Sequence, residues 1–443
     1  MSFFSHFYRF WLKHKKLGVL ALFIFAVMGI FWPIVFGGRA IVNYPTLYHQ
    51  YPSLAFLSKG PGTPLWDPFL LGGYPPYVGE LSYLAPFSLI FKYFNFLEVF
   101  NLSIVLGFFL ALLFSYIFFR NLSLSRAVSS FAAFTYSFSH LNISWGSLII
   151  FNVSFWLVPL LFLAVLKISS GKKAYFWAGA GAVALGWYLG FGEFQIYTIF
   201  ALLAFSLFLS IRSESGRGLL RRFSAAIYTV GFIAVGTFLA LPRLVTAYNF
   251  LGYSVRAAGA KGETSFLNLN LAKAIFPYLN IPFIEKLSPL ISNSPLELYV
   301  GILPWLLVGL LFLGIRKVKV HGTFPFFVIL LAVSYLPMIR VSHLFDLIYK
   351  LTFGVFGGSW KLAFLGNFSL SVLAGLGLQK IEDLRRQNFF PKFANVCKYL
   401  VGGIIAFFIA LQIAFRLFRN SILAVLNNLF AERFYDQTAG KAL

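Results

Sequence analysis

Apolar runs separated by short polar segments recur along most of the chain. A helix that crosses the hydrocarbon core of a bilayer needs about 20 consecutive, mainly apolar residues. Eleven segments approach or reach that length: 17–36, 100–119, 127–142, 148–166, 174–191, 194–211, 224–242, 297–315, 324–339, 359–378 and 399–415. Several are shorter than a full span, which predicts tilted or re-entrant helices among them. The pattern therefore predicts an all-α polytopic membrane protein.

The first apolar run, 17–36, follows a basic start that includes Arg9, Lys13, Lys15 and Lys16. Its apolar stretch is longer than the core of a secretory signal peptide, and no small-x-small cleavage site follows it. We therefore expect this run to stay in the protein as a membrane anchor.

Composition agrees with the hydropathy pattern, because 59% of the residues are hydrophobic and only 11% are charged. A soluble domain of this size would expose far more charge, so that class is excluded. The formal net charge of +23 raises the question of nucleic-acid binding. With the N-terminus in the cytoplasm, however, more than half of the 36 Lys and Arg residues fall in the predicted cytoplasmic segments. Cations collect there in membrane proteins, so the charge predicts an orientation and no nucleic-acid partner.

No internal repeat or linker divides the chain, which predicts a single transmembrane domain over 1–443. Two predicted outer segments, 37–99 and 243–296, are long, and 416–443 is a C-terminal tail. Long loops in a compact bundle usually carry function or short helices of their own. The predicted helices hold almost no charge at mid-depth, where ion-coupled transporters place paired ionisable groups. This pattern argues against an ion-coupled transporter.

Residues 64–75 read PLWDPFLLGGYP, a predicted outer-loop stretch rich in proline and glycine. This stretch resembles the outer-loop signature of the YfhO-type bacterial membrane proteins. Further motifs follow in the same order: FGEFQIY at 191–197, LALPRLVTAYNFLGYSVRAAG at 239–259 and KLAFLGNFSLSVLAGLGL at 361–378. The resemblance extends over residues 15–380.

The YfhO-type family resembles the GT-C glycosyltransferases, which are multi-span enzymes that take a sugar from a polyprenyl-phosphate donor. The resemblance implies a GT-C-like fold and sugar transfer at the outer face of a bacterial cytoplasmic membrane. It also implies an envelope glycan, lipid or protein as the acceptor. One position departs from the pattern, because GT-C enzymes carry an Asp early in the first outer loop and this chain has Asn43 there. An amide does not take a proton from a hydroxyl, so a catalytic chain would need another carboxylate.

Three outer carboxylates are candidates for this base: Asp67, Glu80 and Glu193. Asp67 lies between Trp66 and Pro68, where it either caps a short helix or contacts the substrate. Glu80 precedes an apolar run and is either a surface residue or part of the site. Glu193 lies at a predicted outer hinge between two spans. A carboxylate at the membrane edge needs either a function or a cationic partner.

Transfer from a lipid phosphate also needs cations that stabilise the leaving phosphate. The outer candidates are Arg243, Arg256, Lys261, Arg340 and Lys361. Arg256 is preferred because it follows a Pro-ended span near the head-group plane, and because a guanidinium can bind phosphate through two parallel hydrogen bonds. The alternative for each cation is that its side chain extends to the lipid head groups.

Trp66, Tyr74 and Tyr77 in the first outer loop fit sugar stacking, and they fit an interfacial aromatic belt at least as well. His343 and Asp346 lie three residues apart, but two ligands without a third give a weak metal signal. We therefore predict no cofactor, with a divalent metal unsupported by the sequence.

The sequence thus favours a GT-C-like enzyme that transfers a sugar from a polyprenyl-phosphate donor to an envelope acceptor. Two alternatives stay open, namely a transporter or flippase of a lipid-linked glycan and a non-catalytic scaffold of GT-C descent. Polar residues along a central path would favour the flippase, and Asn43 favours the scaffold.

Overall fold

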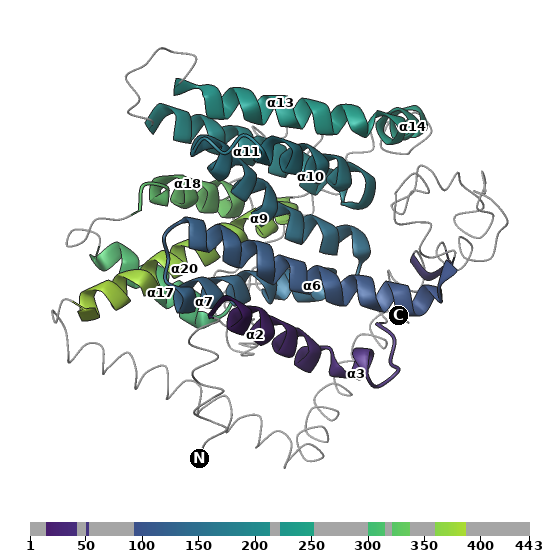
Figure 1. Cartoon of the computed structure of the whole chain (residues 1–443), viewed down its shortest axis with the longest axis horizontal. Coiled ribbons are helices and arrows are strands. Elements are labelled where there is room, and N and C mark those ends of the chain that lie inside the picture. Colours follow the sequence, from purple (N-terminus) through teal and green to yellow (C-terminus); the bar gives the residue numbers. More distant parts are fainter. Residues whose placement is uncertain are drawn as a thin grey trace, which may run out of the picture. The chain divides into compact units, whose positions relative to one another are not determined.

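The computed structural model is helical throughout the part of the chain that it describes (Figure 1). The described residues are 15–41, 50–52, 93–212, 222–251, 300–314, 321–336 and 359–386. No strand occurs among them. The predicted all-α class is therefore confirmed for these residues.

The main helices have the following bounds: α2 (Lys15–Ile30), α3 (Trp32–Val35), α6 (Phe96–Asn121), α7 (Arg126–Ser137), α8 (His140–Trp145), α9 (Ile149–Ser169), α10 (Tyr175–Leu189), α11 (Gly192–Arg212), α13 (Ser224–Leu239), α14 (Leu241–Leu251), α17 (Ile302–Gly314), α18 (Phe324–Tyr335) and α20 (Ala363–Arg386). A 3-10 turn, η6 (Ser359–Leu362), precedes α20.

Three described helices, α6, α9 and α11, are long and apolar enough to cross a membrane. The bent pair α13–α14 makes a fourth candidate if it is counted as one span, and α2, α17 and α18 are shorter apolar helices. These helices indicate a multi-pass membrane protein. The total of eleven spans stays a prediction, and the predicted span at 399–415 lies outside the described residues.

Helix α9 lies at the centre of the helix packing, where it contacts α6, α10, α11 and α13. Its apolar window is 83% buried, against 50% for the windows of α6 and α11. Facing α9, the core is largely aromatic. The ring of Phe162 lies 5.2 Å from that of Phe205 in α11 and 5.2 Å from that of Phe368 in α20. Because lipid is as apolar as these side chains, close van der Waals packing holds such a core together.

Helices α10 and α13 pack side by side through small residues. A Cβ added at Gly236 would lie 2.4 Å from the carbonyl oxygen of Ala180 and 2.7 Å from Cβ of Val183. The absence of a side chain at Gly236 therefore lets the two backbones approach closely, as is common between membrane helices.

Three predicted spans are interrupted in the structure. Residues 17–36 form α2 and α3, and residues 127–142 form α7 and the first half of a second helix, α8. Residues 224–242 form α13 and the start of α14, with a bend of 66° between the two helices. Pro242 lies just beyond this bend, and its missing N–H interrupts the helical hydrogen-bond ladder.

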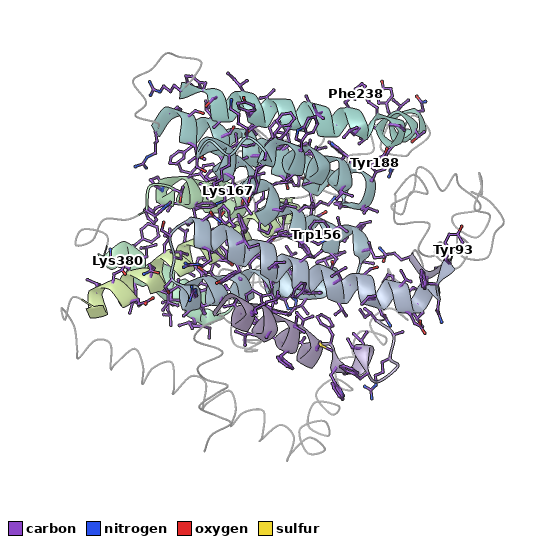
Figure 2. All side chains as sticks on the ribbon, viewed as in Figure 1. Tyr93, Trp156, Lys167, Tyr188, Phe238 and Lys380 are labelled. Carbon is purple, nitrogen blue, oxygen red and sulfur yellow. The ribbon has the colours of Figure 1, made fainter. Side chains whose placement is uncertain are left out.

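Successive helices α9, α10, α11 and α13 alternate in direction, so their ends gather at two levels. One level, here named the basic end, holds Arg120, Lys167, Lys172, Lys173, Arg212 and Arg222 at helix ends or in adjoining turns. The opposite level, here named the Glu193 end, holds Glu193, Arg243 and Lys361. Lys167 and Tyr188, labelled in Figure 2, lie at the basic end and the Glu193 end respectively.

The turn before α18 is fixed by a side chain from the basic end of α11. Arg212 Nη1 donates a hydrogen bond of 2.6 Å to the carbonyl oxygen of Gly322. In the same turn, His321 Nδ1 accepts the backbone N–H of Thr323 at 3.3 Å. Burial lowers the pKa of His321, and the charge of Arg212 lowers it further. Both effects favour the neutral imidazole, which is the form that can accept this hydrogen bond at Nδ1.

Candidate functional site

The turn between α10 and α11 is anchored to the first residues of α9. The backbone N–H of Phe191 lies 3.0 Å from Ser154 Oγ and 3.2 Å from the carbonyl oxygen of Ile150. A Cβ added at Gly190 would lie 2.7 Å from the carbonyl oxygen of Gly186 and 3.0 Å from Ser154 Oγ. Glycine at this position therefore allows the turn to sit directly on α9.

This turn places Glu193 in the first turn of α11. The unsatisfied N–H groups and the macrodipole of a helix N-terminus favour a negative charge at that position. The Glu193 side chain is 12% exposed, so it keeps a narrow opening to its surroundings.

Lys361, in η6, forms a salt bridge with Glu193. Lys361 Nζ lies 2.5 Å from Glu193 Oε2, although the two residues are 168 positions apart. The Lys361 side chain is 11% exposed. The contact joins a residue predicted as a base to a residue predicted as a phosphate-binding cation. It also joins the beginning of α11 to the beginning of α20.

Aromatic rings surround the salt bridge. Lys361 Nζ lies 5.1 Å from the centroid of the Phe191 ring, which is within the range of a cation–π contact. One residue after Glu193, Phe194 stacks on Phe364 of α20 with ring centroids 4.3 Å apart. These contacts hold both ends of the salt bridge in a largely apolar setting, where charge–charge interactions are stronger than in water.

Gly192, the residue before Glu193, is not packed against a neighbour, because a Cβ added there would meet no atom of the described residues within 4 Å. Gln50, from the long segment between α3 and α6, also reaches this region, because its Oε1 accepts the backbone N–H of Ile149, at the start of α9, at 3.4 Å.

The arrangement supports two kinds of chemistry. A carboxylate can take a proton from a hydroxyl when its cationic partner is engaged elsewhere. An ammonium can bind a phosphate group. The same salt bridge also gives Glu193 a structural role, because a cationic partner offsets the cost of a carboxylate that is only 12% exposed.

Among the other predicted site residues, Arg243 lies in α14 at the Glu193 end and is half-buried. The remaining ones lie outside the described residues: Asp67, Glu80, Arg256, Lys261, Arg340, Trp66, Tyr74 and Tyr77. Asn43 lies outside them as well. The structure therefore brings together Glu193 and Lys361 and leaves the contribution of the long outer loops as a prediction.

Sequence reasoning missed three residues that shape the site. Phe191 lies beneath the ammonium of Lys361, Ser154 anchors the turn, and Gln50 binds the start of α9. Gly190 and Gly192, which flank Phe191, are the feature of the sequence that indicates a tight turn at this position. Neither Ser154, inside an apolar run, nor Gln50 carries a comparable signal. No group of three potential metal ligands occurs in the part of the chain that was searched, which is limited to the described residues.

No family model matches the chain, and a search of curated proteins finds no match either. The resemblance to the YfhO-type and GT-C proteins therefore rests on the motifs of the sequence. The functional argument rests on the geometry around Glu193 and Lys361.

Proposed function

We propose that the protein transfers a sugar from a polyprenyl-phosphate donor to an envelope acceptor, with Glu193 as the general base and Lys361 as a phosphate-binding cation. One observation carries this proposal. Glu193 and Lys361, which the sequence suggests separately for these two roles, lie in contact at the N-terminus of α11. The motif containing Glu193 and the motif beginning at Lys361 both belong to the YfhO-type resemblance.

The salt bridge has to open for the reaction to proceed. The donor phosphate binds Lys361 in place of the carboxylate, and Glu193 then accepts the proton of the acceptor hydroxyl. The acceptor oxygen forms a bond to the anomeric carbon as the bond from that carbon to the phosphate oxygen breaks. Polyprenyl phosphate leaves with the electron pair of the broken bond, and the ammonium of Lys361 stabilises its negative charge.

The proposed orientation follows from the charge at the two ends. Cations of a membrane protein collect on the cytoplasmic side, so the basic end faces the cytoplasm and the Glu193 end faces outward. The N-terminus is then cytoplasmic, because α2 runs antiparallel to α6, with Phe23 against Tyr116 and Phe31, just after α2, against Phe108. In this orientation, the salt bridge lies at the outer face of a bacterial inner membrane.

The salt bridge also favours a second candidate function. A carboxylate that is satisfied by a lysine needs no substrate to explain its position, and Asn43 occupies the region where GT-C enzymes carry an acid. Both facts fit a non-catalytic scaffold of GT-C descent.

The test compares Glu193→Gln with Glu98→Gln. Glu98 is an exposed acid in the first turn of α6, also at the Glu193 end, and therefore provides a matched control. Envelope glycans of cells that carry each variant, the wild type or a gene deletion would be compared by mass spectrometry. Loss of a general base typically lowers a rate by about 10² to 10⁴. We expect the product glycan to disappear in the deletion and in Glu193→Gln and to persist in Glu98→Gln.

Membrane levels of all variants would be measured on the same cells. A glycan that persists at wild-type abundance in Glu193→Gln, at equal protein level, would exclude Glu193 as the base. An envelope that is unchanged by the deletion itself would support the scaffold.

A further inference from the structure

Helix α13 does not continue in a straight line into α14. The two helices meet at Ala240 with a bend of 66°. At a rise of about 1.5 Å per residue, α13 is about 24 Å long, which is somewhat less than the hydrocarbon thickness of about 30 Å. With α13 along the membrane normal, α14 would begin close to the boundary between acyl chains and head groups.

Two aromatic side chains of α10 hold this bend in place. Tyr188 donates a hydrogen bond from its hydroxyl to the carbonyl oxygen of Leu239 at 3.1 Å. Its neighbour Trp187 donates from Nε1 to Thr237 Oγ1 at 3.2 Å. The carbonyl of Leu239 belongs to the last residue of α13, where the helical ladder ends. Because open backbone groups are costly near lipid, these hydrogen bonds identify the bend as a stabilised feature of the fold.

An apolar stripe follows one side of α14 outward from the bend. Leu241, Val245 and Tyr248 are 41%, 52% and 76% exposed, and their spacing places them on one face of the helix. The stripe continues the exposed apolar surface at the end of α13, where Phe238 is 69% exposed and Leu239 is 53% exposed. Figure 2 labels Phe238 beside α14 and Tyr188 on the neighbouring α10.

We propose that α14 lies along the membrane interface, with this stripe inserted among the lipids of the leaflet at the Glu193 end. The exposed end of α13 is lipid-facing surface of a candidate span, and the stripe extends that surface without a break. Trp187 and Tyr188, at the bend, are the residue types that concentrate at head-group level. Tyr248, the outermost residue of the stripe, also combines an apolar ring with a polar tip. An amphipathic helix that lies flat in the interface has this composition.

The orientation of α14 bears on the position of Glu193 and does not depend on the proposed sugar transfer. Tyr188, which binds the bend, lies five residues before Glu193 in the sequence. The bend and the salt bridge are therefore both next to the C-terminal end of α10. A helix that rests on the lipid surface there would fix the depth of Glu193 relative to the head groups. That depth is the level at which the phosphate of a lipid-linked donor lies.

Nitroxide labels at single cysteines would test the orientation of α14. The lone cysteine, Cys397, would be changed to serine. Leu241→Cys, Val245→Cys and Tyr248→Cys would then be labelled and reconstituted in vesicles of oleoyl phosphatidylethanolamine and phosphatidylglycerol. Depth would be measured from the relative access of oxygen and a water-soluble nickel complex. With the 66° bend, labels at 241 and 248 should differ in depth by about 4 Å, whereas an upright helix would separate them by about 10 Å.

Labels at Thr246 and Ala247, which are half-buried on the other side of α14, provide the controls and should have low access to both reagents. Phe238→Cys offers a second reference at the bend if Leu241→Cys does not fold. A depth difference near that of an upright helix would overturn the proposal. High nickel access with low oxygen access at all three stripe positions would overturn it too, because the stripe would then face water or a soluble partner.

Discussion

The salt bridge between Glu193 and Lys361 can be tested for its contribution to stability independently of any activity. Glu193→Gln keeps the shape of the side chain and leaves the ammonium of Lys361 without this carboxylate. Lys361→Met keeps most of the length of the side chain but removes the ammonium, so it leaves the carboxylate without this partner and also removes the cation–π contact with the Phe191 ring. The double variant removes both charges together.

The expected magnitudes follow from burial. Removal of one partner of a buried ion pair costs about 3 to 5 kcal/mol, because the other charge stays buried without compensation. The two side chains are 11% and 12% exposed, so a part of this cost is relieved by solvent or head groups. We therefore expect each single variant to lose about 2 to 3 kcal/mol and the double variant to lose only about 1 to 2 kcal/mol. The coupling energy would then be about 3 kcal/mol.

Equilibrium unfolding in mixed micelles of a mild detergent and dodecyl sulfate would measure these differences. Glu98→Gln and Lys172→Met serve as controls, because both residues are exposed, and each should change the unfolding free energy by less than about 0.5 kcal/mol. Single variants that lose no more stability than these controls would show that the salt bridge is not formed in the folded protein. A double variant that loses the sum of both single losses would show that the two charges do not interact.

Two further predictions concern packing and pH. Gly236→Ala should lose about 1 to 3 kcal/mol of stability, because its Cβ would overlap the carbonyl oxygen of Ala180. The control Gly181→Ala, with open space at its Cβ, should be neutral or stabilising. Equal effects of the two variants in the same unfolding assay would contradict the close approach of α10 and α13. Burial lowers the pKa of His321 in the folded protein. The contribution of its neutral ring to the free energy of unfolding is therefore fully present above the pKa of the unfolded state, about 6.5, and decreases as the pH falls below that value. His321→Gln should flatten this part of the curve of unfolding free energy against pH, and an unchanged slope would exclude His321 as its source.

The long buried helices could be predicted well from the sequence. The apolar run at 148–166 corresponds to α9 and the run at 194–211 corresponds to α11, with ends that differ by only a few residues. Both are apolar on all sides, so their hydropathy alone defines them. Breaks were harder to predict. The interruption at Phe138 has no proline or glycine beside it, so the sequence carries no strong helix-breaking signal at that point.

The two described members of the candidate site were each recognisable in the sequence, but their contact was not. Glu193 follows a glycine pair at a predicted hinge, and Lys361 begins an apolar run. Their contact depends on α20 starting beside α11, which is set by the packing of Phe194 on Phe364 and by the wider aromatic core. Periodicity along one helix carries no information about such a pairing across 168 residues.

A strong salt bridge in the resting protein would constrain how the proposed reaction could begin. A coupling energy of about 3 kcal/mol would correspond to a factor of more than 100 in an equilibrium constant. A donor phosphate that displaces Glu193 from Lys361 would have to offset this loss. The cost is smaller if the released carboxylate immediately accepts a hydrogen bond from the acceptor hydroxyl, because a buried charge is then not left without a partner. Binding of donor and acceptor would therefore favour one another. The salt bridge would keep the base engaged until both substrates are present, and this restraint would protect the donor from premature transfer to water.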